Sequence, residues 1–256
     1  MSKIRVGVQL PPQHTTYASY AQAVRDVESL GVDTIFNWDH FFPLSGDPQG
    51  NHFEAMTLLT AIATLTTRAE IGTLVTCNSY RNPALLSNMA KTIDHISGGR
   101  LILGIGAGWC ERDYAEFGYT FGAAPDRLRA LGQALPIITQ RWQVDVPAPV
   151  RNPIPIMIGG GGEQVTLKLT AKYASIWNFF DRDGQYKHKN QVLNEWCEKV
   201  GRNPAEIERS MTVFNSKDLD KCVEAGATHI IMGSGEPWNM DAVEELVEWR
   251  DKQNRD

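Results

Sequence analysis

The sequence predicts an α/β fold in which eight parallel strands, each followed by a helix, close into a TIM barrel. Three observations support this prediction. Short apolar runs rich in β-branched residues alternate with longer helical patterns from one end of the chain to the other. Eight runs of each kind can be counted. The length of 256 residues is typical of one such barrel, so we expect residues 1–256 to form a single domain.

The runs expected to form strands are residues 5–10, 34–38, 70–77, 101–106, 154–158, 175–179, 211–215 and 229–233. The helices are expected between them, at residues 17–30, 53–66, 83–97, 126–139, 163–173, 186–200, 218–225 and 241–252. In the first helix, Ala21, Val24, Val27 and Leu30 recur at helical spacing before Gly31 ends it.

Two short insertions are expected in this barrel, one after the second strand and one after the fourth. Residues 41–51 contain Pro, Gly and Asp and follow the second strand, on the face where barrel enzymes build their sites. Prolines at 147, 149, 153 and 155 exclude a helix interior, so residues 142–155 are expected to be an extended connection into the fifth strand.

Composition and charge exclude several classes of partner. A net charge of −5 and the absence of any apolar run near eighteen residues argue against nucleic acid and membrane as partners. The N-terminus lacks a secretory signal pattern, which favours a cytoplasmic protein. The four cysteines are widely spread, without CxxC pairs or Cys/His clusters, so reduced thiols and no metal site are expected. A small molecule is the expected partner.

Trp38, Asp39 and His40 leave the second strand at the catalytic rim of the barrel. A histidine beside a carboxylate is suited to act as an acid or base near neutral pH, and Trp38 is suited to pack against a flat ring. The alternative is that Asp39 caps the following loop while His40 forms a local hydrogen bond. His14, His52 and Arg112 follow strand ends or loops and are candidates to reach a ligand, whereas His95, His188 and His229 are expected to be structural.

Glycines mark two further places. Gly104, Gly106 and Gly108 alternate at the end of the fourth strand, which leaves room on one face for a ligand or for a close backbone. This spacing differs from a dinucleotide-binding fingerprint, because the third glycine is misplaced and no acidic residue stands about twenty positions on at the end of a second strand. The four glycines at 159–162 precede Glu163 and are expected to open a helix, so their N–H groups form a candidate phosphate site. The alternative is a flexible connector.

Several motifs follow one another in a specific order along nearly the whole chain. They are Trp38-Asp39-His40, Ile71-Gly72-Thr73, Tyr80-Arg81-Asn82-Pro83, Gly98-Gly99-Arg100, Gly104-Ile105-Gly106-Ala107-Gly108-Trp109, the glycines at 159–162 and residues 174–178. In these motifs the chain resembles the luciferase-like monooxygenase superfamily, and within it the oxidoreductases that depend on the deazaflavin coenzyme F420.

The resemblance implies a cis peptide bond between Leu74 and Val75, on which the cofactor ring would lie. It implies that His40 and Asp39 are catalytic, beside the reactive centre of the ring, and that the chain is plausibly a homodimer. The residues implied to bind the cofactor are Trp38, Asp39, Leu74, Val75, Cys77, Gly106, Ala107, Gly108, Trp109, Gly159, Gly160, Gly161, Gly162 and Glu163.

The implied activity is hydride transfer between C5 of the deazaflavin and an organic substrate. An FMN-dependent monooxygenase is one alternative, and a non-catalytic cofactor or ligand carrier is another. Phe41, Phe42, Trp109 and Phe180 suggest a hydrophobic or conjugated substrate, although rim aromatics are often plain packing. Related sugar-phosphate dehydrogenases have a catalytic glutamate where this chain has Trp109, and the short span between the fourth and fifth strands should leave the pocket open.

Overall fold

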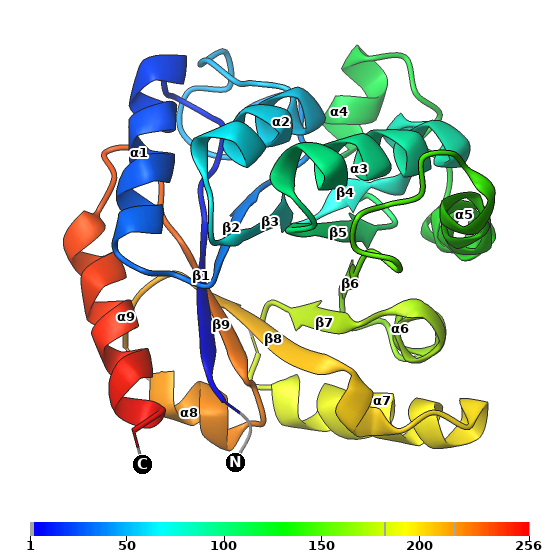
Figure 1. The fold of residues 1–256 in the computed structure, drawn as a ribbon. Helices are drawn as coiled ribbons and strands as arrows, with labels where there is room; N and C mark the ends of the chain where they lie inside the picture. The colour runs from blue at the N-terminus through cyan, green and yellow to red at the C-terminus, as the bar shows by residue number, and fades with distance from the viewer. Residues whose placement is uncertain (1–2, 182, 218, 256) are drawn as a thin grey trace.

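A computed structural model describes residues 3–181, 183–217 and 219–255, and it has the predicted barrel (Figure 1). All strand pairs are parallel, and β1 (Arg5–Gln9) pairs with both β2 (Thr34–Asn37) and β9 (His229–Gly233). The ring continues through β8 (Glu208–Val213), β7 (Ile176–Phe179), β6 (Ile156–Gly159) and β5 (Leu101–Gly106). Both β3 (Glu70–Thr73) and β4 (Thr76–Cys77) pair with β5, so they are two parts of one barrel strand, and the ring closes with eight positions.

Helices surround this sheet on its outer side (Figure 1). They are α1 (Tyr17–Ser29), α2 (Ala55–Leu65), α3 (Pro83–Ser97), α4 (Glu111–Glu116), α5 (Ala124–Val144), α6 (Thr166–Tyr173), α7 (Tyr186–Val200), α8 (Leu219–Glu224) and α9 (Met240–Gln253), with 3-10 turns η1 (Asn78–Tyr80) and η2 (Pro204–Glu206). The ends of α3 show how sequence sets these bounds: Asn82 caps its first turn, Pro83 begins it, and Gly98 ends it with φ 68°. Among the described residues, none of these helices combines the length and apolar character needed to cross a bilayer.

The structure differs from the predicted helices in three places. Helix α4 was not predicted, and α5 extends to Val144 because Trp142 is buried and its indole donates to the Ser87 carbonyl oxygen at 3.1 Å. The prediction that the extended connection starts at residue 142 was therefore wrong. The helix expected from residue 163 begins only at Thr166. Residue 218, the expected start of the next helix, lies outside the described residues, as do residues 1, 2, 182 and 256.

The barrel interior is layered from an apolar centre to two polar ends. Phe36, Ile102, Met157, Ile176 and Ile231 form a buried cluster inside the ring, with the half-buried Leu74 packed against it. A larger apolar core lies between the sheet and the helices. Because side chains fill the centre, open space inside the ring is left to the carboxyl ends of the strands.

The amino ends of the strands are joined by ion pairs. Arg5 bonds Glu208 at 3.1 Å and also pairs with Glu70, which in turn pairs with Arg151. Nδ1 of the buried His229 lies 3.4 Å from a Glu208 oxygen, and Nε2 bonds the Thr34 hydroxyl at 2.8 Å. This network explains why β8 begins at Glu208, three residues before the apolar run that predicted it. The half-buried Glu208 and the buried Arg209 at the start of the strand have polar partners, which offset the cost of burying them.

Glu208→Gln is expected to destabilise the protein by about 2 kcal/mol at pH 7. Burial raises the pKa of Glu208, but His229 and Arg5 outweigh burial and lower it to about 2. A carboxyl with a lowered folded-state pKa stabilises the fold above its ordinary pKa, and that contribution is lost as the pH falls toward about 2. Urea unfolding of both proteins from pH 7 to pH 3 measures the difference.

Glu206→Gln is the control, because Glu206 forms only an exposed i,i+4 pair with Arg202 and should change stability by less than about 0.5 kcal/mol. Equal losses in the two variants, or a loss for Glu208→Gln that does not shrink with acid, would contradict the assignment.

Candidate functional site

A cavity of about 500 Å³ lies at the carboxyl ends of the strands. Of the residues predicted to bind a cofactor or catalyse, those that line it are Trp38, Asp39, His40, Leu74, Val75, Cys77, Gly106, Ala107, Gly108, Trp109, Gly159 and Gly160. Gln9, Thr212 and Phe214 also line it and were not singled out from the sequence. The structure therefore brings together the rim of the second strand, the third-strand break and both glycine segments.

The floor of the cavity is built around Val75. The peptide bond between Leu74 and Val75 is cis, as the resemblance implied. A Cβ added at Gly106 would lie 2.9 Å from Val75 Cγ2, and one at Gly159 would lie 3.1 Å from Val75 Cγ1. At Gly104 the added Cβ would lie 1.8 Å from the Thr73 carbonyl oxygen. Because these three residues are glycines, Val75 and the backbone of the third strand can pack directly against them. For the same reason no side chain projects from these three positions, and the floor of the cavity is smooth.

Gln9 fixes this floor from β1, which is separated from β3 in the ring by β2 alone. Its side-chain amide on β1 donates to the Leu74 carbonyl oxygen at 2.7 Å, and the side chain is almost fully buried. Nothing in the sequence marked Gln9, because its place on the strand is the same as that of an ordinary core residue. Its role follows only from the fold, which brings β1 close to the third-strand break.

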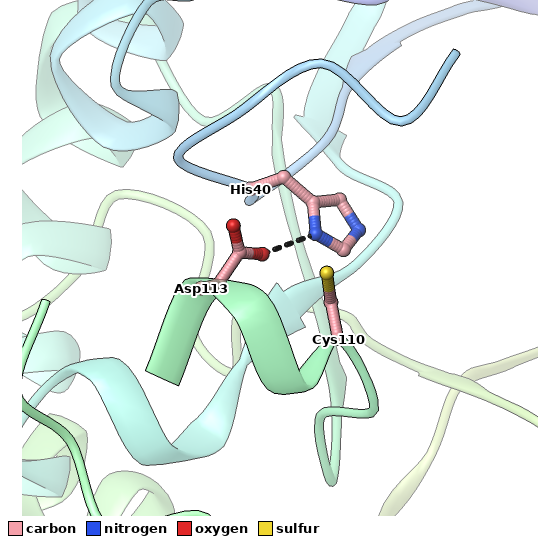
Figure 2. A group of neighbouring side chains, drawn as sticks. All are labelled: His40, Cys110 and Asp113. Carbon is pink, nitrogen blue, oxygen red and sulfur yellow. Dashed lines mark hydrogen bonds and ion pairs between the residues drawn. The ribbon is translucent and has the colours of Figure 1, made fainter. Parts of the chain in front are cut away.

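The partner of His40 is Asp113, on α4 (Figure 2). His40 Nδ1 lies 2.6 Å from an oxygen of Asp113, which is fully buried. The carboxylate also accepts hydrogen bonds from the Phe41 N–H at 3.2 Å and the Tyr80 hydroxyl at 3.1 Å. Burial raises the pKa of Asp113, but the bonds from His40, Phe41 and Tyr80 together outweigh it and hold the pKa below its usual value. Asp113 is therefore an anion that fixes one nitrogen of His40.

The carboxylate of Asp39 is bonded by Arg81 and Cys77, whereas His40 is bonded by Asp113. Arg81 donates to both Asp39 oxygens, at 2.6 and 3.0 Å, and the Cys77 N–H donates to one of them at 2.9 Å. The carboxylate is buried and fully engaged, and Arg81 also pairs with Glu54. Asp39 thus ties the second strand to the segment after the third, which fits the loop-capping alternative, and a catalytic role for it stays a prediction.

Trp38 is held by His52. The Trp38 indole N–H donates to His52 Nε2 at 3.0 Å. Burial, and then the proximity of His40, lower the pKa of His52 to about 4, so its ring is neutral at pH 7 and accepts this bond. His14 bonds the Ser45 carbonyl oxygen, and Arg112 packs on the Phe42 ring at 4.1 Å. These three side chains support the loops around the cavity and do not line it.

The glycine turn is positioned by β7. The Gly160 N–H donates to the Asn178 carbonyl oxygen at 3.0 Å, and the Trp177 indole donates to the Gly160 carbonyl oxygen at 2.9 Å. A Cβ at Gly161 would lie 2.5 Å from the Phe179 ring. The turn is therefore packed in place, which argues against a flexible connector. A role in phosphate binding stays a prediction.

Two groups of rim side chains that were predicted to face a ligand do not line the cavity, and a role for Glu163 in binding the cofactor stays a prediction. The Glu163 carboxylate pairs with Lys189 at 2.5 Å and His188 at 3.0 Å, so it is directed to α7 and does not line the cavity. Phe41 stacks on Phe117 with ring centroids 3.9 Å apart, and Phe42 also packs against Phe117, so neither lines the cavity. Sequence order could not show the packing of Phe41 and Phe42, because Phe117 directly follows α4, a short helix that was not predicted.

The fold and the site define a parallel (β/α)8 barrel with a ligand-sized cavity at its carboxyl mouth. The chain belongs to the luciferase-like monooxygenase family, whose sequence model matches residues 1–220. It is 31% identical over 218 residues to the F420-dependent glucose-6-phosphate dehydrogenase of Amycolatopsis mediterranei, a match that covers 77% of this chain. The chain spans 64% of the length of that relative.

Solved structures share the fold. A TM-score of 0.86 relates the chain to an F420-dependent secondary alcohol dehydrogenase in complex with an F420-acetone adduct, at 17% identity and covering 95% of this chain and 98% of that one. The F420-dependent tetrahydromethanopterin reductase of Methanopyrus kandleri has a TM-score of 0.80, at 17% identity, with 99% of this chain and all of that one covered.

Arg81→Gln is expected to destabilise the protein by about 3 kcal/mol, because it leaves the buried Asp39 carboxylate without its bidentate partner. Urea unfolding at pH 7 measures the change. Arg129→Gln removes only an exposed pair with Asp126 and should cost less than about 0.5 kcal/mol. A stability loss for Arg81→Gln no larger than that of the control would show that Asp39 does not depend on Arg81.

Proposed function

We propose that this protein is an F420-dependent oxidoreductase that transfers a hydride between C5 of the deazaflavin and an uncharged, hydrophobic or conjugated organic substrate. The observation that carries the proposal is the cavity itself. It places a smooth floor of Val75 and glycines beside a histidine whose other nitrogen is fixed by a buried carboxylate. Family membership and the F420-dependent relatives support the choice of cofactor.

The residues present fit a tricyclic ring. The cavity volume is in the range of sites for small molecules and cofactors. Leu74 and Val75 would lie under the ring, and the backbone of 106–108 and 159–160 would flank it, since Gly106, Gly108, Gly159 and Gly160 have no side chains. The N–H groups of the 159–162 turn other than that of Gly160, which bonds Asn178, would hold the phosphate of the tail. When bound, the deazaflavin supplies the hydride donor or acceptor at C5.

His40 supplies the proton that accompanies the hydride. Asp113 accepts from Nδ1, so Nε2 is the nitrogen left to exchange a proton with a substrate oxygen in the cavity. The carboxylate also stabilises the ring when it carries both protons. Trp38 and the largely exposed Trp109, whose ring centroid lies 5.4 Å from that of His40, flank the imidazole and limit access of water.

The charges in the cavity favour an uncharged substrate. Among the described residues that line it there is no lysine or arginine, and Trp109, Phe179, Phe180 and Phe214 provide apolar surface. A phosphate group entering this cavity would lose water without gaining a cationic side chain. An alcohol, aldehyde, ketone or enone suits the site better than a sugar phosphate. A homodimer and a cytoplasmic location stay predictions from the sequence.

The direct test of the cofactor is a fluorescence titration of the purified protein with oxidised F420, reduced F420 and FMN. Tight binding of F420 with weak binding of FMN is expected. Preference for FMN would replace the proposal by a flavin monooxygenase, and F420 binding without turnover of any alcohol or carbonyl tested would favour a cofactor carrier.

His40→Ala is expected to lower kcat by about 100-fold or more while leaving the F420 Kd within about threefold. Asp113→Asn should also lower kcat more than it changes the cofactor Kd, because the amide no longer favours a proton on Nδ1. Steady-state kinetics and the titration above measure both quantities. His95→Ala is the control, since His95 is far from the cavity and bonds only the Ala148 carbonyl oxygen. Unchanged kcat in His40→Ala would remove the catalytic assignment.

Gly106→Ala is expected to weaken F420 binding by about tenfold or more, because the new methyl group would push Val75 into the space for the ring. Gly235→Ala is the matched control, because a Cβ there meets nothing within 4 Å. Circular dichroism checks that both variants fold. Wild-type affinity in a folded Gly106→Ala protein would show that the ring does not lie on this floor.

A further inference from the structure

Three side chains that can bind metal ions meet beside the cavity, and of the three only His40 lines it. A nitrogen of His40, the Cys110 sulfur and an Asp113 oxygen all lie within 4.8 Å of one another. His40 comes from the loop after β2, whereas Cys110 and Asp113 stand at the first turn of α4 (Figure 2). No metal-ligand spacing is visible in the sequence here, because only folding brings His40 to Cys110 and Asp113.

The three groups match the donors that zinc prefers. Imidazole nitrogen, thiolate and carboxylate oxygen are its usual protein ligands, and three such ligands leave a fourth position for water. The Phe41 N–H and the Tyr80 hydroxyl hold the Asp113 carboxylate from behind, which is the outer-shell support that metal ligands require. Cys110 and Asp113 are three residues apart at the start of one helix, and the Asp113 N–H bonds the Cys110 carbonyl oxygen at 3.1 Å. Their relative positions are therefore fixed before any ion arrives.

We propose that His40, Cys110 and Asp113 form a binding site for a divalent cation of the zinc type, which takes the place of the proton between His40 and Asp113. Binding removes the proton from the Cys110 thiol and moves the Nδ1 proton of His40 to Nε2 or to solvent. The ion then bonds Nδ1, sulfur and a carboxylate oxygen, with water from the cavity in the fourth position. The three donor atoms lie within 4.8 Å of one another, and His40 Nδ1 and the Asp113 oxygen, now 2.6 Å apart, would separate to admit the ion.

The site would couple metal ions to catalysis. An ion on Nδ1 separates His40 from Asp113 and prevents the protonated state of the ring. On the proposed function, it therefore inhibits hydride transfer reversibly while leaving the floor of the cavity untouched. Cys110 serves only the metal in this scheme and has no part in holding the cofactor or substrate.

The test uses the full chain, freed of metal with a chelator and kept reduced. Titration with Co²⁺ should give a 1:1 thiolate-to-cobalt absorption band, and Zn²⁺ should displace the cobalt. Cys110→Ser should abolish that band and weaken Zn²⁺ binding by at least about tenfold, as measured against a chromophoric chelator. Cys77→Ser is the matched control, because it removes the cavity-lining thiol but keeps the proposed ligand set, and it should retain the band.

The absence of saturable 1:1 binding in the wild type, or wild-type Zn²⁺ affinity in Cys110→Ser shown to fold by circular dichroism, would overturn the proposal. A second experiment measures F420-dependent turnover with and without added Zn²⁺. Cys110→Ser should keep this turnover and lose the inhibition by Zn²⁺. Sensitivity equal to that of the wild type would also contradict it. The cobalt band is independent of turnover, so failure of the proposed F420 activity leaves the metal site testable.

Discussion

The site depends on one steric constraint, the approach of Val75 to strands that have no side chains facing it. Val75 can lie across the mouth of the barrel only because Gly106 and Gly159 leave its methyl groups unobstructed. The Thr73 carbonyl oxygen likewise occupies the space that a Cβ at Gly104 would fill. Because Gln9 holds the Leu74 carbonyl oxygen from β1, the floor is clamped from both sides of the ring. The positions of His40, Trp38 and the glycine turn matter chemically only relative to this floor.

The two ends of the barrel use the same pair of residue types for different purposes. At the amino end, His229 faces Glu208 within a closed network that includes Arg5 and Thr34, and every member has a structural partner. At the carboxyl end, His40 faces Asp113, but one side of the imidazole lines an open cavity. The chemistry of an imidazole and a carboxylate is alike in both places. What separates a stabilising pair from a reactive one is access to a ligand, and the layered apolar core between them keeps the two apart.

Periodicity predicted the barrel and most of its elements, because the alternation of strands and helices is a local property of the chain. It failed where contacts between residues distant in sequence set the ends of an element. Strand β8 begins early because the polar Glu208 has ion-pair partners, and α5 continues to Val144 because Trp142 is buried. The motifs located the cavity, including the Leu74–Val75 bond, but they assigned the wrong neighbour to His40. Asp39 is adjacent in sequence yet bound by Arg81, whereas Asp113 is remote in sequence and lies on a helix too short to show a clear pattern.

The buried state of Asp113 also limits what this site can do. A carboxylate with its oxygens bonded to His40, Tyr80 and the Phe41 N–H cannot itself move to a substrate, so its influence reaches the cavity only through the imidazole. The fixed position of Asp113 also makes the site less selective between a proton and a metal cation. An anion held rigidly beside an imidazole favours any positive charge placed between them, and a proton and a divalent cation both satisfy that condition. The nearby thiol of Cys110 favours softer cations over harder ones. The rigid carboxylate that orients His40 therefore also favours the binding of such cations.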